Sequence, residues 1–354
     1  MTLLKNRIPR ILFLGFGHGL NDLIPGYFLG ALVQVKLDVL QISIGLLLYN
    51  LLAFGGQYPV ALLLEKTGTP KKFLLIAYGL NIAALAVFAL APQLGIVLAG
   101  IASAIYHVAG GTVCAQDNKA ANIGMFAAPG VAGLIAGGYF AFEKIHITGW
   151  LLAIATVFFI LLASIRIKNT LVIKKEETEN KKFSLDQHDL IMILLLTIIS
   201  LRSVIWDIFQ LIHDKNYSWL LAIAAAAFAG KIIGGWAADK IGWRLYTVSS
   251  LFLATPLITF FRNELILFCI GIGLLQSSIP ATTSMLIHSM KGKTERAIGL
   301  SFGTAIMAGV IVFYTPARNV LLSNLFIWIT AALMLSLLFF AGKRRNPVHP
   351  DFRS

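Results

Sequence analysis

Ionisable and strongly polar side chains occur within segments of this sequence that are otherwise apolar. In the first such segment His18, Asn21 and Asp22 are spaced i, i+3 and i+4, so a helix would place them on one face. An ionised carboxylate at the bilayer centre costs ~2.5–3.5 kcal/mol, so Asp22 should face the protein interior. Such a carboxyl beside an imidazole could bind and release a proton. The alternative is a structural network in which Asp22 only ties its helix to a neighbour.

A second polar group lies in the fourth apolar segment. His107 shares a predicted helix face with Ser103 and with the small residues Gly110, Gly111 and Cys114. A groove of small residues beside an imidazole could admit a substrate or another helix. The histidine could also share proton transfer with Asp22, although a lone buried histidine often has only structural partners.

The seventh apolar segment carries Arg202 near its middle. An arginine at this depth needs a carboxylate, carbonyl groups or an anionic substrate, and we favour Asp22 over an anionic substrate as its partner. Lys231, near one end of the eighth segment, is expected to extend to the membrane surface. Ser203, Asp207 and Gln210 form a separate polar stripe nearer the outer end of the seventh segment. Gln276 in the tenth segment could line a cavity between the halves.

The elements that must position these residues are apolar segments of about twenty residues, the length that spans ~30 Å of hydrocarbon as a helix. Of the 354 residues 58% are hydrophobic and 13% are charged, and the mean hydropathy is +0.81. We therefore predict an all-α membrane protein of about twelve transmembrane helices in two pseudo-symmetric six-helix bundles. The segments are Ile8–Val35, Ile42–Leu64, Phe73–Ala91, Leu94–Ala115, Ala120–Phe142, Thr148–Ile167, Leu190–Ile212, Trp219–Ala238, Leu245–Phe261, Leu265–His288, Ile298–Thr315 and Val320–Ala341.

The distribution of basic residues predicts the orientation. With both termini in the cytoplasm, the inner regions hold 22 Lys and Arg and the outer loops hold five, with two inside spans. Such an excess is typical of cytoplasmic loops, so we predict a multi-pass protein of the inner, cytoplasmic membrane. The net charge of +13 is therefore attributed to topology, and no nucleic-acid partner is expected.

The chain is expected to divide into two halves. We predict a six-helix bundle over 1–167, a charged cytoplasmic linker over 168–189, a second bundle over 190–342 and a cytoplasmic tail over 343–354. A shift of 174 residues superimposes the end of the second segment on the end of the eighth, so that Asp239 falls on Glu65. Parallel repeats of this kind occur in transporters, with the substrate site between the halves.

At these residues the sequence resembles the major facilitator superfamily, whose loop between the second and third helices carries Gly-x-x-x-Asp-Arg/Lys-x-Gly-x-Arg/Lys. The second copy matches it closely, whereas the first has Ala61 for the leading glycine and Glu65 for the aspartate, and its trailing base moves to Lys71. The resemblance implies that these loops act in gating. The residues implied are Glu65, Lys66, Gly68, Gly235, Asp239, Lys240, Gly242 and Arg244.

A narrower resemblance is to the fosmidomycin-resistance branch, which is similar to proton-coupled drug exporters. Three motifs carry it: His18-Gly-Leu-Asn21-Asp22, Ser103-Ala-Ile-Tyr106-His107 followed by Gly110-Gly111, and Leu201-Arg202-Ser203. In place of the branch's usual His-Pro-Glu-Gly, this chain has His107-Val-Ala-Gly110. The Gly-rich segment around Ala128-Pro129-Gly130 resembles the corresponding helix of family antiporters, or it serves packing alone.

We therefore expect a secondary active transporter, an antiporter that exports small drug-like or metabolite molecules with protons as partners, and that works as a monomer. Proton-coupled uptake of a small organic anion is one alternative. The other is a non-transporting membrane assembly factor or receptor derived from the same fold. No enzyme, cofactor or metal site is expected, because the sequence has no phosphate-binding loop, no zinc-ligand spacing and no arrangement of a nucleophile with a base.

Overall fold

The computed structural model describes residues 7–32, 39–170, 187–212, 217–290, 293–304, 306–309 and 318–343. The described residues form helices and short connections, without a strand. This is the expected result for segments whose backbone groups must hydrogen-bond internally in hydrocarbon. The predicted linker over 168–189 and the tail over 343–354 fall mostly outside the described residues.

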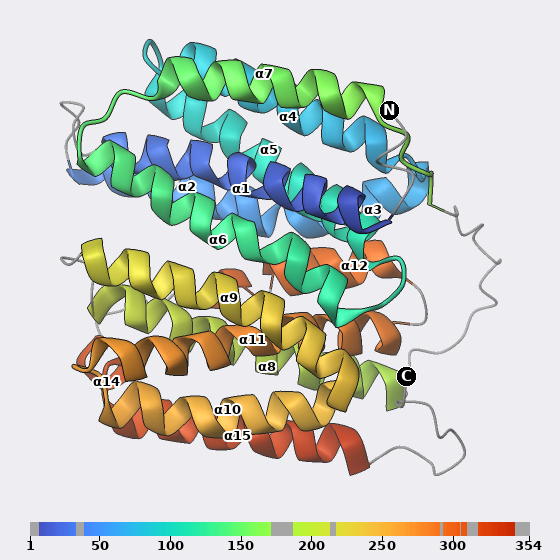
Figure 1. Ribbon diagram of the computed structural model, residues 1–354, viewed down its shortest axis with the longest axis vertical. Coiled ribbons are helices and arrows are strands. Elements are labelled where there is room, and N and C mark those ends of the chain that lie inside the picture. Colours follow the sequence, from blue (N-terminus) through green and yellow to red (C-terminus); the bar gives the residue numbers. More distant parts are fainter. Residues whose placement is uncertain are drawn as a thin grey trace.

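The first half contains the helices α1 to α7, which form the upper group in Figure 1. A π-helical turn, η2, separates α2 from α3. These three elements together occupy the second predicted span. The elements are α1 (Arg7–Leu32), α2 (Val39–Asn50), η2 (Leu51–Gly55), α3 (Gln57–Thr67), α4 (Pro70–Val87), α5 (Pro92–Ala115), α6 (Ala120–Phe142) and α7 (Thr148–Ser164).

The second half repeats this arrangement below the first. A second π-helical turn, η3, follows α12 and packs against η2 across the two halves. The elements are α8 (Gln187–Ile212), α9 (Tyr217–Ile241), α10 (Trp243–Phe260), α11 (Leu265–Ser289), α12 (Thr294–Gly299), η3 (Leu300–Thr304), α14 (Arg318–Leu321) and α15 (Asn324–Lys343).

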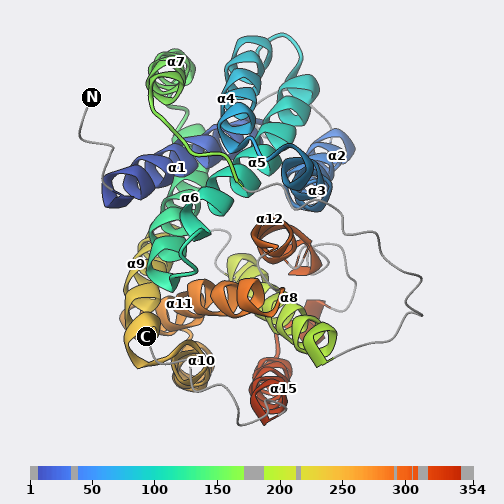
Figure 2. The same ribbon diagram turned by 90° about the vertical axis from the view of Figure 1, so that its right-hand side faces the viewer.

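Eight of the described helical runs are long and apolar enough to cross a membrane, and α7 is a shorter apolar helix. Each of the twelve predicted segments coincides with helix, although parts of the first and of the eleventh lie outside the described residues. The helices form two bundles, and we call the end at which α1 begins and α15 ends the N/C end. Figure 2 views the molecule from that side.

The two halves meet mainly along α6 and α9, with α12 packed against α3 and α5. Glycines allow helices to come close both between the halves and within the first half. A Cβ added to Gly235 of α9 would lie 2.5 Å from the carbonyl oxygen of Ala120, and one on Gly15 of α1 would lie 2.7 Å from that of Met125 in α6. Close packing of small residues is a common basis for helix association in membranes.

Candidate functional site

Three predicted side chains meet inside the first half. His18 and Asp22 come from α1 and His107 from α5, and all three are at least 90% buried. The two Nε2 atoms of His18 and His107 lie 2.8 Å apart. The Oδ2 atom of Asp22 lies 3.2 Å from Nε2 of His18 and 3.5 Å from Nε2 of His107. We call these three residues the His-Asp-His cluster.

The other ring nitrogens determine what this cluster can hold. Nδ1 of His18 lies 2.8 Å from the carbonyl oxygen of Phe126, and Nδ1 of His107 lies 2.7 Å from that of Ser103. A carbonyl oxygen can only accept, so each Nδ1 donates its hydrogen. With both rings neutral, two Nε2 lone pairs and a carboxylate oxygen would therefore face one another. The geometry calls for a proton, or another cation, among the three atoms.

The same three side chains could also hold a metal ion, because one ligand atom from each lies within 4.8 Å of the others. Sequence spacing does not reveal this group, since His18 and His107 are 89 residues apart. Donation from both Nδ1 atoms to backbone carbonyls is the arrangement that supports metal-bound histidines.

A chain of amide groups positions Asp22. The Nδ2 group of Asn21 donates to Oδ1 of Asp22 at 2.9 Å, and the Nδ2 group of Asn81 in α4 donates to Oδ1 of Asn21 at 2.8 Å. Asn21 and Asn81 are fully buried. Asn81 is not among the predicted site residues, although a polar residue inside the third apolar segment is a signal that could have found it.

Small residues of α5 and α6 surround the cluster. A Cβ added to Gly130 of α6 would lie 2.6 Å from both Oδ2 of Asp22 and Nε2 of His18. The groove predicted beside His107 is filled by other helices, because Gly110 faces the ring of Phe126 and Gly111 faces Ile298 of α12. In this structure the groove therefore serves packing between helices.

Tyr106 lies one residue before His107 but has a different environment. Its side chain is fully buried, and its hydroxyl donates to the carbonyl oxygen of Leu14 at 2.8 Å. The hydroxyl also occupies the space beside Gly17. Tyr106 thus joins α5 to α1 behind the cluster.

Arg202 belongs to the second half, and its predicted pairing with Asp22 is wrong. Its Nη1 atom donates to Oγ1 of Thr282 in α11 at 3.0 Å. The carboxylate of Asp22 contacts the two histidines and Asn21 instead, because those partners lie within its own bundle. Thr282 is one of several threonines in apolar segments, so nothing in its sequence position marks it as the partner of Arg202.

Lys231 of α9 does not extend to the membrane surface as expected. Its ammonium nitrogen lies 3.5 Å from the carbonyl oxygen of Ala127, a residue in the interior of α6 in the other half. From there it interacts electrostatically with Asp22, His107 and Arg202. Lys231 thus places positive charge between the His-Asp-His cluster and Arg202.

The other predicted cavity residues are separate from the cluster. Ser203 and Asp207 are buried in α8, where the carboxylate of Asp207 lies beside Gly309. Gln276 is buried in α11, and its neighbours Ser277 and Ser278 donate to carbonyls of their own helix. Gln210 belongs to α8, but its side chain lies outside the described part of the structure.

At the N/C end a carboxylate of the second half binds the first half. The two carboxylate oxygens of Asp239 accept hydrogen bonds of 2.9 Å from the backbone N–H groups of Ala120 and Ala121, in the first turn of α6. A helix N-terminus carries unpaired N–H groups and partial positive charge, so it suits a carboxylate. Trp243 also donates from Nε1 to Asp239 at 2.7 Å.

The pseudo-equivalent carboxylate crosses in the opposite direction. Glu65, at the end of α3, binds Arg296 in the first turn of α12 through two hydrogen bonds, one from Nε and one of 3.1 Å from Nη2. The hydrogen bond to Glu65 raises the pKa of the Arg296 guanidinium, so the guanidinium remains charged. Two contacts related by the internal repeat therefore join the halves at the N/C end.

The two signature loops share further features. Gly68 and Gly242 have φ values of 61° and 96°, a conformation that favours glycine. The trailing bases also correspond, since Lys71 donates to Ala163 and Ile165 at the end of α7 while Arg244 donates to Phe339 near the end of α15. Lys66 is exposed, and Lys240 lies over the ring of Trp236.

Long apolar helices in two bundles, with charged side chains buried within them, define a multi-pass membrane protein. Residues 11–314 match the model of the Major Facilitator Superfamily, so the chain belongs to that family. No curated protein matches significantly.

Two solved structures illustrate the similarity of fold. The Escherichia coli fucose:proton symporter FucP has a TM-score of 0.70 at 13% identity, over 95% of this chain and 98% of that chain. The human organic anion transporter MFSD10 (TETRAN) has a TM-score of 0.61 at 13% identity, over 95% of this chain and all of that chain.

Proposed function

We propose that this protein is a proton-coupled secondary transporter that exports small drug-like or metabolite molecules by alternating access of its two bundles. The His-Asp-His cluster is the observation that carries the proposal. It gathers two imidazole nitrogens and a carboxylate oxygen within 3.5 Å of one another, in an arrangement that calls for a proton. Loss of that proton would leave like partial charges in contact, which would favour a different arrangement of the helices.

The N/C end is assigned to the cytoplasm of the inner membrane in this proposal. The excess of Lys and Arg in the regions at that end supports the assignment. The contacts of Glu65 and Asp239 would then close the cytoplasmic side, and alternating access would require both to separate. The protein would act as a monomer, because the contacts of Glu65 and Asp239 join the two halves of one chain.

The substitution Asp22→Asn tests the proposal. It keeps the shape of the side chain but removes the negative charge that holds the proton between the histidines. The purified protein is first screened by thermal shift against ethidium, a cationic dye, and fosmidomycin, a phosphonate. Flux of the stabilising probe is then driven by a pH gradient in proteoliposomes, and in the variant it should fall to the level of protein-free liposomes.

The exposed carboxylate of Asp117 offers a matched control, because Asp117→Asn makes the same chemical change outside the cluster. Its flux should equal that of the wild type. Undiminished pH-driven flux in Asp22→Asn would refute the assignment of the proton site. A wild-type protein that moves no probe would instead favour the non-transporting receptor or assembly factor.

Uptake of a small organic anion is a second candidate, favoured by the partners of two cations, the buried Arg202 and the half-buried Lys231. Arg202 donates to a threonine hydroxyl and Lys231 lies against a backbone carbonyl, so the hydrogen-bond partners described for them are neutral, although Lys231 also interacts electrostatically with Asp22. An anionic substrate would neutralise both. The same proteoliposomes distinguish the candidates. Export predicts that the probe moves against the direction of proton flow, and uptake predicts that fosmidomycin moves with it.

A further inference from the structure

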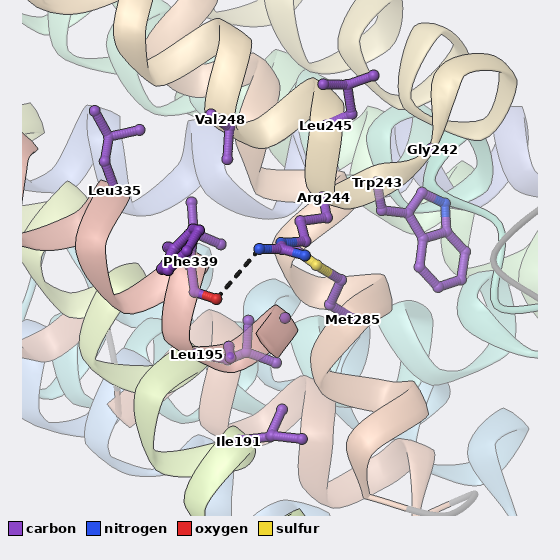
Figure 3. A pocket seen from close by; sticks show the side chains of 13 residues that line it. Ile191, Leu195, Gly242, Trp243, Arg244, Leu245, Val248, Met285, Leu335 and Phe339 are labelled. Atoms are coloured by element: carbon purple, nitrogen blue, oxygen red, sulfur yellow. Dashed lines mark hydrogen bonds between the residues drawn. The ribbon is translucent and has the colours of Figure 1, made fainter. Parts of the chain in front are cut away.

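A cavity of about 600 Å³ opens at the N/C end of the second half, away from the His-Asp-His cluster. This size is within the range of small-molecule sites, ~300–1,000 Å³. It lies among α8, α10, α11 and α15, and its lining includes Ile191, Leu195, Arg244, Val248, Met285 and Leu335 (Figure 3). We call it the Arg244 cavity.

The walls of the Arg244 cavity are mostly apolar, with aliphatic side chains beside Met285, Trp243 and Phe339. Ile191 and Leu195 come from the first turns of α8, Val248 from α10, and Leu335 lies two turns before the end of α15. The cavity therefore extends ~10 Å along α15, from Gly342 at the N/C end to Leu335, at 1.5 Å per residue. An occupant that fills this space must present hydrocarbon to it, because polar groups there would lose their hydration.

One cation lies at the mouth of this cavity. Arg244, in the first turn of α10, is exposed, and it donates from Nη2 to the carbonyl oxygen of Phe339 at 3.2 Å (Figure 3). Its guanidinium lies over Gly342, where a larger residue would collide with it. The remaining N–H groups of the guanidinium are available to an anion, and its planar geometry suits a phosphate.

We propose that the Arg244 cavity binds an anionic phospholipid, with its phosphate on the Arg244 guanidinium and one acyl chain along Val248 and Leu335. The apolar walls and the one cation among the lining residues, Arg244, match the two parts of such a lipid. Membership of a membrane-transporter family places the chain in contact with lipid at high local concentration, so a modest affinity is sufficient for occupancy. The proposal is independent of proton coupling.

Melting temperature of the full-length protein in an uncharged detergent provides the test. Added phosphatidylglycerol should raise the melting temperature of the wild type, and phosphatidylcholine with the same acyl chains should have a much smaller effect. In Arg244→Gln the half-saturating concentration of phosphatidylglycerol should rise about tenfold, as expected for loss of one charged contact. In Val248→Phe, which fills the cavity, the response should disappear.

Lys71→Gln is the matched control for Arg244→Gln. It removes the corresponding basic contact at the end of α7, so it should lower the starting melting temperature while leaving the lipid response intact. Leu335→Phe replaces Val248→Phe if that variant does not fold.

Three outcomes would overturn the proposal. The first is an equal effect of phosphatidylcholine. The second is a full lipid response in both cavity-filling variants. The third is reproduction of the effect by glycerol phosphate alone, which would show a headgroup site without an acyl chain in the cavity.

Discussion

At the scale of single residues, the hydrogen bonds of two imidazoles determine what the His-Asp-His cluster can hold. His18 and His107 each donate from Nδ1 to a carbonyl, so their Nε2 atoms must meet through a proton or another cation. Asp22 supplies the negative charge, and Asn21 and Asn81 hold its carboxylate in place. The cluster therefore depends on an amide in α4 that acts on it through Asn21.

Asn81→Leu tests that dependence. The substitution leaves Oδ1 of Asn21 buried without its donor, and an unsatisfied buried polar group costs ~1–3 kcal/mol. We expect pH-driven flux of the probe to fall about tenfold, because ~1.4 kcal/mol corresponds to a factor of ten. Proteoliposome flux is the measurement, and Asn50→Leu is the control because Asn50 donates to a carbonyl of its own helix. Equal effects of the two substitutions would remove Asn81 from the site.

At the scale of elements, close contact between α1 and α6 brings the cluster together. Gly130 faces Asp22 and His18, whereas Gly138, two turns further along α6, has its nearest outside atom at an ordinary distance of 3.9 Å. The glycines of α6 thus differ in role, and the sequence pattern alone could not separate those beside the cluster from those with space around them.

The pair Gly130→Ala and Gly138→Ala separates these roles. The methyl group added by Gly130→Ala would press on the carboxylate and one imidazole, so proton-driven flux should fall at least about tenfold, with a stability loss of ~1–3 kcal/mol from overpacking. Gly138→Ala should retain flux and melting temperature. Flux and thermal unfolding are measured on both variants, and a fully active Gly130→Ala would show that the cluster tolerates displacement.

At the scale of the whole molecule, the two halves hold each other at the N/C end through contacts related by the internal repeat. Glu65 binds the first turn of α12, and Asp239, 174 residues further along the chain, binds the first turn of α6. The first signature loop, in which Glu65 stands in place of the aspartate, therefore still makes a contact that joins the two halves. Ala61, which replaces the leading glycine, packs against Gly299 of α12, so the small residue is supplied by the opposite helix.

The double substitution Glu65→Gln with Asp239→Asn should open this end. Each charged contact contributes ~1.5–3 kcal/mol, so the population open at the N/C end should rise at least about tenfold. Cys114 is buried near the end of α5 and reports opening through its rate of maleimide labelling, with the half-buried Cys269 as internal reference. Lys66→Gln, an exposed change in the same loop, should leave the rate unchanged. An unchanged rate in the double variant would mean that other contacts close this end.

The sequence by itself determined the number of spans, their approximate bounds, the internal repeat and the polar face of the first helix. Hydrophobic length and helical spacing are local properties, so they can be read along the chain. The tertiary structure decided which polar groups meet. His107 joins His18 and Asp22 from a different helix far along the chain, Arg202 binds Thr282, and Lys231 crosses to Ala127. These contacts depend on which helices pack against one another in three dimensions, which no spacing within a single helix encodes.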